Sequence, residues 1–164
     1  MTTPALIERP SKIAGWGAFA PTAYAAGDVI AAWKWKDVRL GPRKDLVPGE
    51  DIALQVGPDT FIMRDEAHSV DERINHSCLP NSVVAIETDG AYLKALQPIA
   101  QMAEITFDYS LTMVNKDWTL ENCRCGAPSC RKTIREYRML PENLRRRYEE
   151  MKIVPQYVLL AATA

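Results

Sequence analysis

The sequence predicts one domain that is mainly β, with small sheets, many turns and short helices. Short apolar runs bounded by glycine or polar residues recur along most of the chain, which is typical of short strands. Only one late segment has its apolar residues at helical spacing. The chain has 164 residues, of which 47% are hydrophobic and 25% charged. This is ordinary globular composition, and the length suffices to bury a sizeable core without disulfides.

The predicted strands are separated by polar segments. In chain order, the runs are GAFA (17–20), VIAAW (29–33), DIALQVG (51–57), TFIMRD (60–65) and EITFDYS (104–110). Residues 34–51 are polar and rich in proline and glycine, so they are predicted to form a loop or an insert. A hairpin is predicted within VVAIETDGAYLKAL, because the pair Asp89-Gly90 tolerates the positive φ of a type I′ turn.

One helix is predicted, in the segment LPENLRRRYEEMK. Pro141 suits the first helical position, where its missing N–H costs nothing. Leu144, Tyr148 and Met151 recur at i, i+4 and i+7 and would form one apolar face.

The segment RINHSCLPNS (73–82) is predicted to be a loop and neither a helix nor a strand. Pro80 removes a backbone donor, and asparagine, serine and proline favour turns. This short span holds one of the four cysteines and one of the two histidines. It is therefore the first candidate for a site with chemistry.

The charge and the ends of the chain exclude several classes. The net charge of −1 gives no global attraction to nucleic acid or anionic lipid. No apolar run approaches the length of a membrane span, and the N-terminus lacks the apolar core of a secretory signal. The expected location is cytoplasmic, or nuclear if the chain comes from a eukaryote.

The cysteines indicate a metal site. Cys123, Cys125 and Cys130 lie together in CRCGAPSC, and in a reducing compartment such clustering favours metal over disulfides. Structural zinc takes four ligands in a tetrahedron. The fourth ligand is either Cys78, the only remaining cysteine, or His76. The alternative is that the four cysteines are buried thiols without a metal.

Four segments together resemble the signatures of the SET-domain protein-lysine methyltransferases. NHSCLPN resembles the signature Asn-His-Ser-Cys-x-Pro-Asn, and EITFDY resembles the second signature of the family. SKIAGWGAFA resembles its N-terminal Gly-x-Gly segment, and CRCGAPSCRKTI resembles its zinc-binding post-SET tail. Each motif is weak alone, but the four occur in the order of the family.

The resemblance implies the fold and its divisions. The implied architecture is the β-clip-like SET fold, with small curved sheets, a threaded pseudo-knot, short helices and a C-terminal zinc knuckle plus helix. In the pseudo-knot, the NHSC segment passes beneath a loop of a neighbouring segment. The implied divisions are a SET domain at 5–112 with its insert at about 34–51, a post-SET segment at 119–135 and a C-terminal helical tail at 136–164.

The resemblance also implies an enzyme that transfers a methyl group from S-adenosylmethionine to the side-chain amine of a lysine, with S-adenosylhomocysteine as product. The implied partner is a protein or peptide substrate, histone or non-histone, with neither a membrane nor a nucleic acid expected. One alternative is a catalytically silent SET module that binds a protein or peptide. Another is a zinc-knuckle nucleic-acid binder, against which the near-neutral charge argues.

The site residues follow from the matched motifs. Tyr109 is the implied catalytic residue, and Phe107 lines the lysine channel with it. Phenylalanine leaves room there that a tyrosine hydroxyl would fill, which implies capacity for more than one methyl group. The implied cofactor contacts are Gly15, Trp16, Gly17, Arg73, Asn75, His76 and Tyr109. The implied ligands of a structural Zn²⁺ are Cys78, Cys123, Cys125 and Cys130.

Some positions depart from the family pattern or stay open. Glu72 and Arg73 stand where the family often has Arg-Phe, at places that commonly face the cofactor. In the tail, Trp118, Ile134 and Tyr137 are either walls of the active site or plain core.

Overall fold

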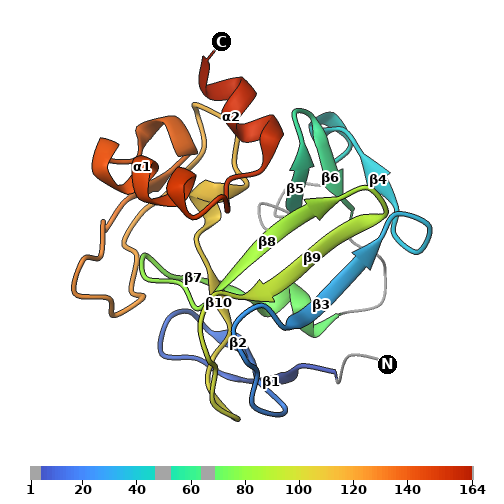
Figure 1. Ribbon diagram of the computed structural model, residues 1–164, viewed down its shortest axis with the longest axis vertical. Coiled ribbons are helices and arrows are strands. Elements are labelled where there is room, and N and C mark those ends of the chain that lie inside the picture. The colour runs from blue at the N-terminus through green and yellow to red at the C-terminus, as the bar shows by residue number, and fades with distance from the viewer. Residues whose placement is uncertain (1–4, 47–52, 64–68, 164) are drawn as a thin grey trace.

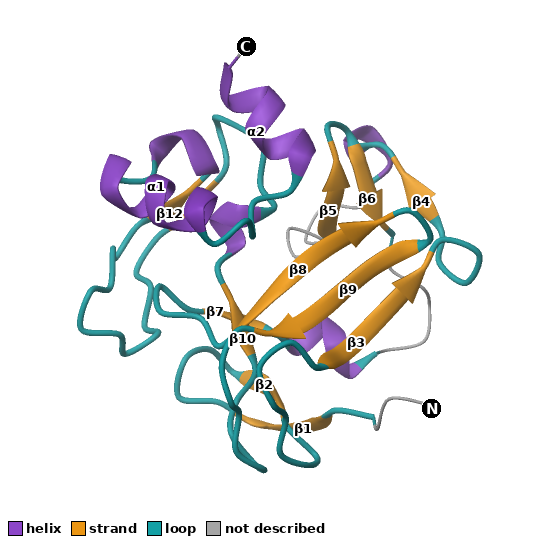
Figure 2. Ribbon diagram, viewed as in Figure 1, coloured by secondary structure: helices purple, strands orange, loops and turns teal. Residues whose placement is uncertain are grey.

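The computed structural model describes residues 5–46, 53–63 and 69–163, and within these ranges the chain is mostly β with two short α-helices. Two three-stranded antiparallel sheets form the centre (Figures 1 and 2). The first, in spatial order, consists of β3 (Val29–Lys34), β9 (Gly90–Ala95) and β8 (Ser82–Glu87). The second consists of β4 (Leu40–Gly41), β6 (Thr60–Ile62) and β5 (Leu54–Gly57).

Three further pairs of short strands surround these sheets. They are β1 (Ile7–Pro10) with β2 (Trp16–Phe19), β7 (Asn75–His76) with β10 (Thr106–Phe107), and β11 (Thr119–Leu120) with β12 (Ile134–Arg135). Only the pair of β7 and β10 is parallel, among the described residues. It places Asn75 opposite Thr106 and His76 opposite Phe107, so two segments distant in sequence lie side by side.

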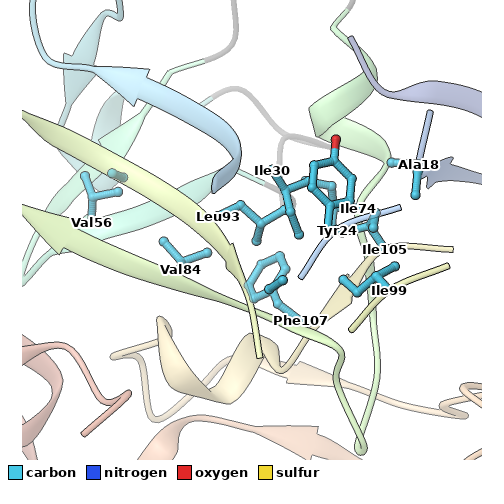
Figure 3. Packing of buried hydrophobic residues seen from close by; sticks show 13 residues of the cluster. Ala18, Tyr24, Ile30, Val56, Ile74, Val84, Leu93, Ile99, Ile105 and Phe107 are labelled. Atoms are coloured by element: carbon cyan, nitrogen blue, oxygen red, sulfur yellow. The ribbon is translucent and has the colours of Figure 1, made fainter. Parts of the chain in front are cut away.

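The main core lies on one face of the β3–β9–β8 sheet. In β9 the side chains alternate between buried and partly exposed, as expected for a strand with one face packed and one solvated. Ile30 of β3, Val84 of β8 and Leu93 of β9 join one apolar cluster with Ile105 and Phe107 (Figure 3). The segment that carries Tyr109 is therefore anchored in the main core through its neighbours.

A second core holds the C-terminal helices, α1 (Glu142–Glu150) and α2 (Gln156–Thr163). Tyr148 of α1 and Val158 of α2 are buried against Val83 of β8 and Leu111, which ends a 3₁₀ helix at Tyr109–Leu111. The helices thus pack beside the sheets and against the segment that follows Tyr109 (Figure 1). Neither helix of the described chain has the length and apolar character needed to cross a membrane.

The hairpin prediction is confirmed, but its turn type is wrong. β8 and β9 pair antiparallel, with Glu87 opposite Gly90. Neither Asp89 nor Gly90 has a positive φ, so the turn is not type I′. Gly90 is needed for a different reason: a Cβ there would lie 2.6 Å from the carbonyl oxygen of Trp33 on the adjacent strand.

Two predictions around the signatures are corrected. The segment 73–82 is not entirely a loop, because Asn75–His76 form the parallel strand β7. The strand predicted at 104–110 is only Thr106–Phe107 long. It ends at Asp108 because the side chain of that residue accepts a hydrogen bond from the Ser110 N–H, which stabilises the 3₁₀ helix that follows.

The helix and insert predictions are partly right. α1 is confirmed, with Pro141 at its N-cap, but Met151 is 43% exposed and does not join the buried face. Helix α2 and strand β1 were not predicted, since neither has a clear apolar period. Within the predicted insert, the described part contains β4 and a 3₁₀ helix at Arg43–Asp45, while residues 47–51 lie outside the described residues.

Candidate active site and metal centre

An open cleft of about 520 Å³ lies between the two central sheets and the segment around Tyr109. Its lining residues come from five separate stretches of the chain and are mostly apolar or aromatic. They are Trp33, Ala53, Leu54, Asp71, Glu72, Ile74, Phe107, Tyr109, Thr112, Met113 and Trp118. A largely apolar cleft with a few polar groups is typical of a site for a small molecule or a side chain.

Tyr109 lies at the point where the two signature segments meet. Its hydroxyl donates a hydrogen bond to the carbonyl oxygen of Ile74, at 2.8 Å. Its backbone N–H donates to Nδ1 of His76, at 3.2 Å, and the two rings are 5.3 Å apart. The ring of Phe107 packs on Tyr109 at 4.8 Å, and that of Trp118 lies 6.5 Å away. Burial raises the pKa of Tyr109, so its hydroxyl stays neutral at neutral pH.

The imidazole of His76 is enclosed and has both nitrogens occupied. It is 3% exposed, and burial lowers its pKa to about 4, so the ring is neutral at neutral pH. Nδ1 accepts from Tyr109, which leaves the proton on Nε2, and Nε2 lies 3.3 Å from Sγ of Cys78. The ring therefore connects Tyr109 to the cysteine cluster, and only the backbone of His76 remains for contact with a small molecule.

The glycine-containing segment at 15–17 is held against Asn75. The amide nitrogen of Asn75 donates to the carbonyl oxygen of Trp16, at 3.0 Å, and to Oε1 of Glu104, at 2.8 Å. Gly15 has a φ of +39°, which suits glycine. At Gly17 a Cβ would lie 2.4 Å from Oε1 of Glu104, so a larger residue would have to displace the carboxylate that binds Asn75. Trp16 is 51% exposed.

The four cysteines converge in space and are all free thiols. Their Sγ atoms lie within 4.8 Å of one another. Backbone N–H groups point at these sulfurs: that of Cys78 donates to Cys125 at 3.5 Å, and that of Arg131 donates to Cys78 at 3.3 Å. Burial raises the pKa of Cys78 and that of Cys123, the latter to about 11. At Cys125 burial is outweighed by N–H donors and neighbouring thiols, and the pKa falls to about 7.

This donor set fits a closed tetrahedral zinc site. Zinc with four thiolates at about 2.3 Å requires sulfurs about 3.8 Å apart, which is compatible with the observed spread. A divalent cation would also neutralise thiolates that otherwise repel one another in a partly buried place. Because all four ligands are protein sulfurs, such a site has no open position for catalysis. His76 contributes no ligand atom to the cluster and instead contacts one of its sulfurs.

A buried ion pair adjoins both the cysteines and Tyr109. Asp108 is fully buried, and the guanidinium of Arg131 binds it through two hydrogen bonds of 2.7 Å. The hydroxyl of Tyr148, on α1, donates to the same carboxylate at 2.9 Å. Asp108 therefore faces away from the cleft, and it joins Arg131 to Tyr148 of α1.

The remaining predicted residues lie in several places. Phe107 lines the cleft, and so does Trp118. Ile134 is buried with the cysteines, and Tyr137 is buried in the C-terminal core, so both are core residues. Arg73 does not line the cleft; its Nε donates to Glu8 of β1, at 3.0 Å.

Sequence reasoning missed several residues that shape the site. Trp33 and Asp71 line the cleft from different elements, and the indole N–H of Trp33 donates to the Asp71 carboxylate. Glu104 bridges Asn75 and the hydroxyl of Ser11. Glu104 lies within the second signature, so its motif was visible, but nothing in the sequence indicated its partners.

Comparison with known proteins gives a second, independent line of evidence about this site. The sequence model of the SET domain family matches residues 15–110. Histone-lysine N-methyltransferase TRX1 of Oryza sativa subsp. japonica is 31% identical over 139 residues, which are 77% of this chain and 13% of that protein. Histone-lysine N-methyltransferase SETD1A of Homo sapiens is 29% identical over 135 residues, which are 76% of this chain and 8% of that protein.

Among solved structures, the crystal structure of KRYPTONITE in complex with mCHG DNA and SAH is similar, with a TM-score of 0.58 and 27% identity over 76% of this chain and 27% of that chain. This chain therefore spans a small part of the length of these relatives. The family match, by contrast, covers more than half of the present chain and includes Gly15, Asn75 and Tyr109. We conclude that this chain belongs to the SET domain family.

Proposed function

We propose that this chain transfers a methyl group from S-adenosylmethionine to the side-chain amine of a lysine in a protein substrate. The observation that carries the proposal is the position of Tyr109, which lines the cleft and whose hydroxyl is bonded to the carbonyl of Ile74, the residue that precedes Asn75. The relatives support it, because TRX1 and SETD1A are both histone-lysine N-methyltransferases, and KRYPTONITE was crystallised with SAH.

The hydrogen bond of Tyr109 suits it to accept from an amine. Its proton is engaged with the carbonyl of Ile74, so the lone pairs of its oxygen are available for an N–H donor. Because its pKa is raised, the oxygen is a neutral acceptor that orients the amine and does not remove a proton. The fixed hydroxyl then aligns the nitrogen lone pair for an in-line displacement at a methyl carbon.

The lining of the cleft also affects the protonation state of the substrate lysine. A free lysine has a pKa near ~10.4 and is mostly an ammonium at neutral pH, without a lone pair. Beside Phe107, Met113 and Trp118 the apolar lining disfavours the charged form, and the sulfonium of a bound cosubstrate would disfavour it further, so both lower the pKa of a lysine amine there, against the opposite effect of Asp71 and Glu72. S-adenosylmethionine supplies a methyl group on a positively charged sulfonium. The expected holders of this cosubstrate are the backbone at Gly15–Gly17 and the residues Asn75 and Tyr109, with the backbone of His76 and with Arg73 nearby.

We further propose that Cys78, Cys123, Cys125 and Cys130 hold a structural Zn²⁺ that takes no part in the chemistry. The proposed divisions are the SET domain at 5–112, the post-SET segment at 119–135 and the helical tail at 136–164. Because phenylalanine at position 107 lacks the hydroxyl that a tyrosine would place there, we propose that more than one methyl group can be accommodated on the amine. Histones and other lysine-containing proteins are both candidate substrates; a histone substrate requires a nuclear location and another protein allows a cytoplasmic one.

The test is a methylation assay with the full chain, S-adenosylmethionine and either histone H3 or an unfractionated protein extract. We expect mass spectrometry to find methyl groups on lysine side chains, and calorimetry to find binding of S-adenosylhomocysteine. Binding without methylation of any protein would indicate a silent SET module. Absence of binding would overturn the proposal as a whole.

The charge of the cleft leads to a prediction about substrate affinity. Its charged lining residues, Asp71 and Glu72, are both acidic. Acidic groups at a cleft attract cations such as a lysine side chain and its basic neighbours. Replacing Glu72 by glutamine removes one negative charge from the cleft lining, which is expected to raise the KM of a basic lysine peptide about two- to fivefold and to leave kcat unchanged. High salt should shrink the difference.

The matched control is Glu87→Gln, which removes an exposed carboxylate of β8 that pairs with Lys94 away from the cleft. This variant should keep the KM of the wild type. Calorimetry with S-adenosylhomocysteine decides what Glu72 faces. An altered affinity for that molecule, with an unchanged peptide KM, would contradict the assignment of Glu72 to the peptide.

A further inference from the structure

The buried carboxylate of Asp108 occupies a special place in the chain, between the two residues that line the cleft, Phe107 and Tyr109. It has no access to water, so its charge depends entirely on protein donors. Arg131 supplies two hydrogen bonds, the Ser110 N–H supplies one at 3.0 Å, and the Tyr148 hydroxyl supplies one at 2.9 Å.

Among the residues that donate to Asp108, Tyr148 lies in a separate part of the chain, the C-terminal helical tail. It belongs to α1, whereas the family match ends at residue 110. Tyr148 is only 4% exposed, and its hydroxyl reaches the same oxygen, Oδ2, that Nη1 of Arg131 binds. The tail therefore places a hydroxyl directly on the family signature, and the donor of this hydrogen bond comes from outside the part of the chain that the family match covers.

The network limits the freedom of the backbone at Tyr109. Asp108 is held on one side by Arg131 and Tyr148, and the N–H of Tyr109 is held on the other by His76. Both carboxylate oxygens of Asp108 are hydrogen-bonded, although Nε of Arg131 has no partner among the described residues. A buried carboxylate held in this way restrains the segment that carries it, and one lost partner costs more than an average hydrogen bond. Because a reacting group must be held to within a fraction of an ångström, loosening this segment lowers the rate.

We infer that Tyr148 is a positioning residue of the active site, which acts through Asp108 to hold Phe107 and Tyr109 in place, and that the C-terminal helical tail is consequently part of the catalytic unit. This inference rests on the proposed methyl transfer for its kinetic consequence. Its structural consequence, the rigidity of residues 107–111, can be measured without any activity.

The test compares Tyr148→Phe with Tyr137→Phe. Both variants remove one phenolic hydroxyl from the same core, and each hydroxyl is bonded to a carboxylate. The hydroxyl of Tyr137 donates to Glu149, at 2.7 Å, and has no bond to Asp108. Only the first variant therefore alters the network around Tyr109.

Two measurements are made on the full chain. The first is kcat, divided by the number of sites that bind S-adenosylhomocysteine. Calorimetry counts these sites, so a loss of folded protein does not lower the measured kcat. We expect Tyr148→Phe to lower it about tenfold and Tyr137→Phe to change it less than about twofold. The second is amide hydrogen exchange over residues 107–111, which should be about tenfold faster in Tyr148→Phe alone.

Equal behaviour of the two variants in both measurements would overturn the inference. If Tyr148→Phe is poorly folded, Val158→Ala serves as a control of reduced stability, because it leaves a cavity in the same core without touching Asp108. Equal exchange in Tyr148→Phe and Val158→Ala would then also refute the inference. If the wild type transfers no methyl group, the proposed function fails, and exchange at 107–111 alone decides the inference.

Discussion

Removing the proposed zinc ion from the purified protein is expected to abolish the proposed methyl transfer and to disorder the post-SET segment. The hydrophobic support of this segment is small: its core consists of Cys78, Cys123 and Ile134 with partly buried neighbours that include Trp118. Without a cation, the cysteines must either stay protonated or repel one another as thiolates. The cluster then loses the metal–sulfur bonds that mainly stabilise it. Binding of structural zinc contributes about 10–16 kcal/mol in small zinc-finger peptides, which is enough to decide folding locally.

The loss should reach the active site by three routes. Trp118, which lines the cleft, directly precedes this segment and packs against its core. Arg131 follows Cys130 directly and carries the guanidinium that binds Asp108. His76, whose ring contacts both Cys78 and the N–H of Tyr109, is the third route. We therefore expect chelation to abolish methyl transfer completely. We also expect it to make hydrogen exchange faster over residues 119–135.

The measurement combines elemental analysis, activity and exchange. The wild type should contain one zinc ion per chain, and Cys125→Ser should contain much less and be inactive. Restoring activity to the chelated wild type with Zn²⁺ is the control that excludes irreversible damage. Full activity in protein shown to be free of metal would contradict the structural role assigned to the cysteines.

Much of the secondary structure and the members of the site could be predicted, because these depend on local pattern. The hairpin of β8 and β9 follows from two apolar runs around Asp89-Gly90, and α1 follows from the spacing of Leu144 and Tyr148. The cysteines could be grouped because thiolates are few and selective ligands. Tyr109 and Asn75 were identified by motif, and the structure brings their segments together through β7 and β10.

The rest could not be predicted because it depends on contacts between distant segments. Gly90 looks like a turn glycine, but glycine is required there because a Cβ would clash with the carbonyl oxygen of Trp33 on another strand. Asp108 continues an apparent strand, but its side chain ends that strand by capping the next turn. The partners Arg131 and Tyr148 become visible only when the post-SET segment and α1 are packed on that carboxylate.

Replacing Tyr109 by phenylalanine is expected to lower kcat at least about a hundredfold, because the oxygen that orients the amine is lost while the ring remains. The cost in stability should be only about 1 kcal/mol, since a single hydrogen bond, to the carbonyl of Ile74, is removed. Binding of S-adenosylhomocysteine should change less than about threefold, because the ring of Tyr109 remains and the other proposed holding residues, at Gly15–Gly17 and Asn75, are untouched. The checks are single-turnover methylation, thermal unfolding and calorimetry.

Tyr92→Phe is the matched control, since the Tyr92 hydroxyl donates to Asp89, at 2.7 Å, on the β8–β9 hairpin and does not line the cleft. It should keep the rate of the wild type. A slow Tyr109→Phe that still binds S-adenosylhomocysteine would assign the loss to the chemical step. If Tyr109→Phe instead keeps its rate, the hydroxyl is only a structural donor to Ile74, and orientation of the amine must come from another group in the cleft. Among the polar lining residues, the hydroxyl of Thr112 would then be the next to test, because it follows the same 3₁₀ helix.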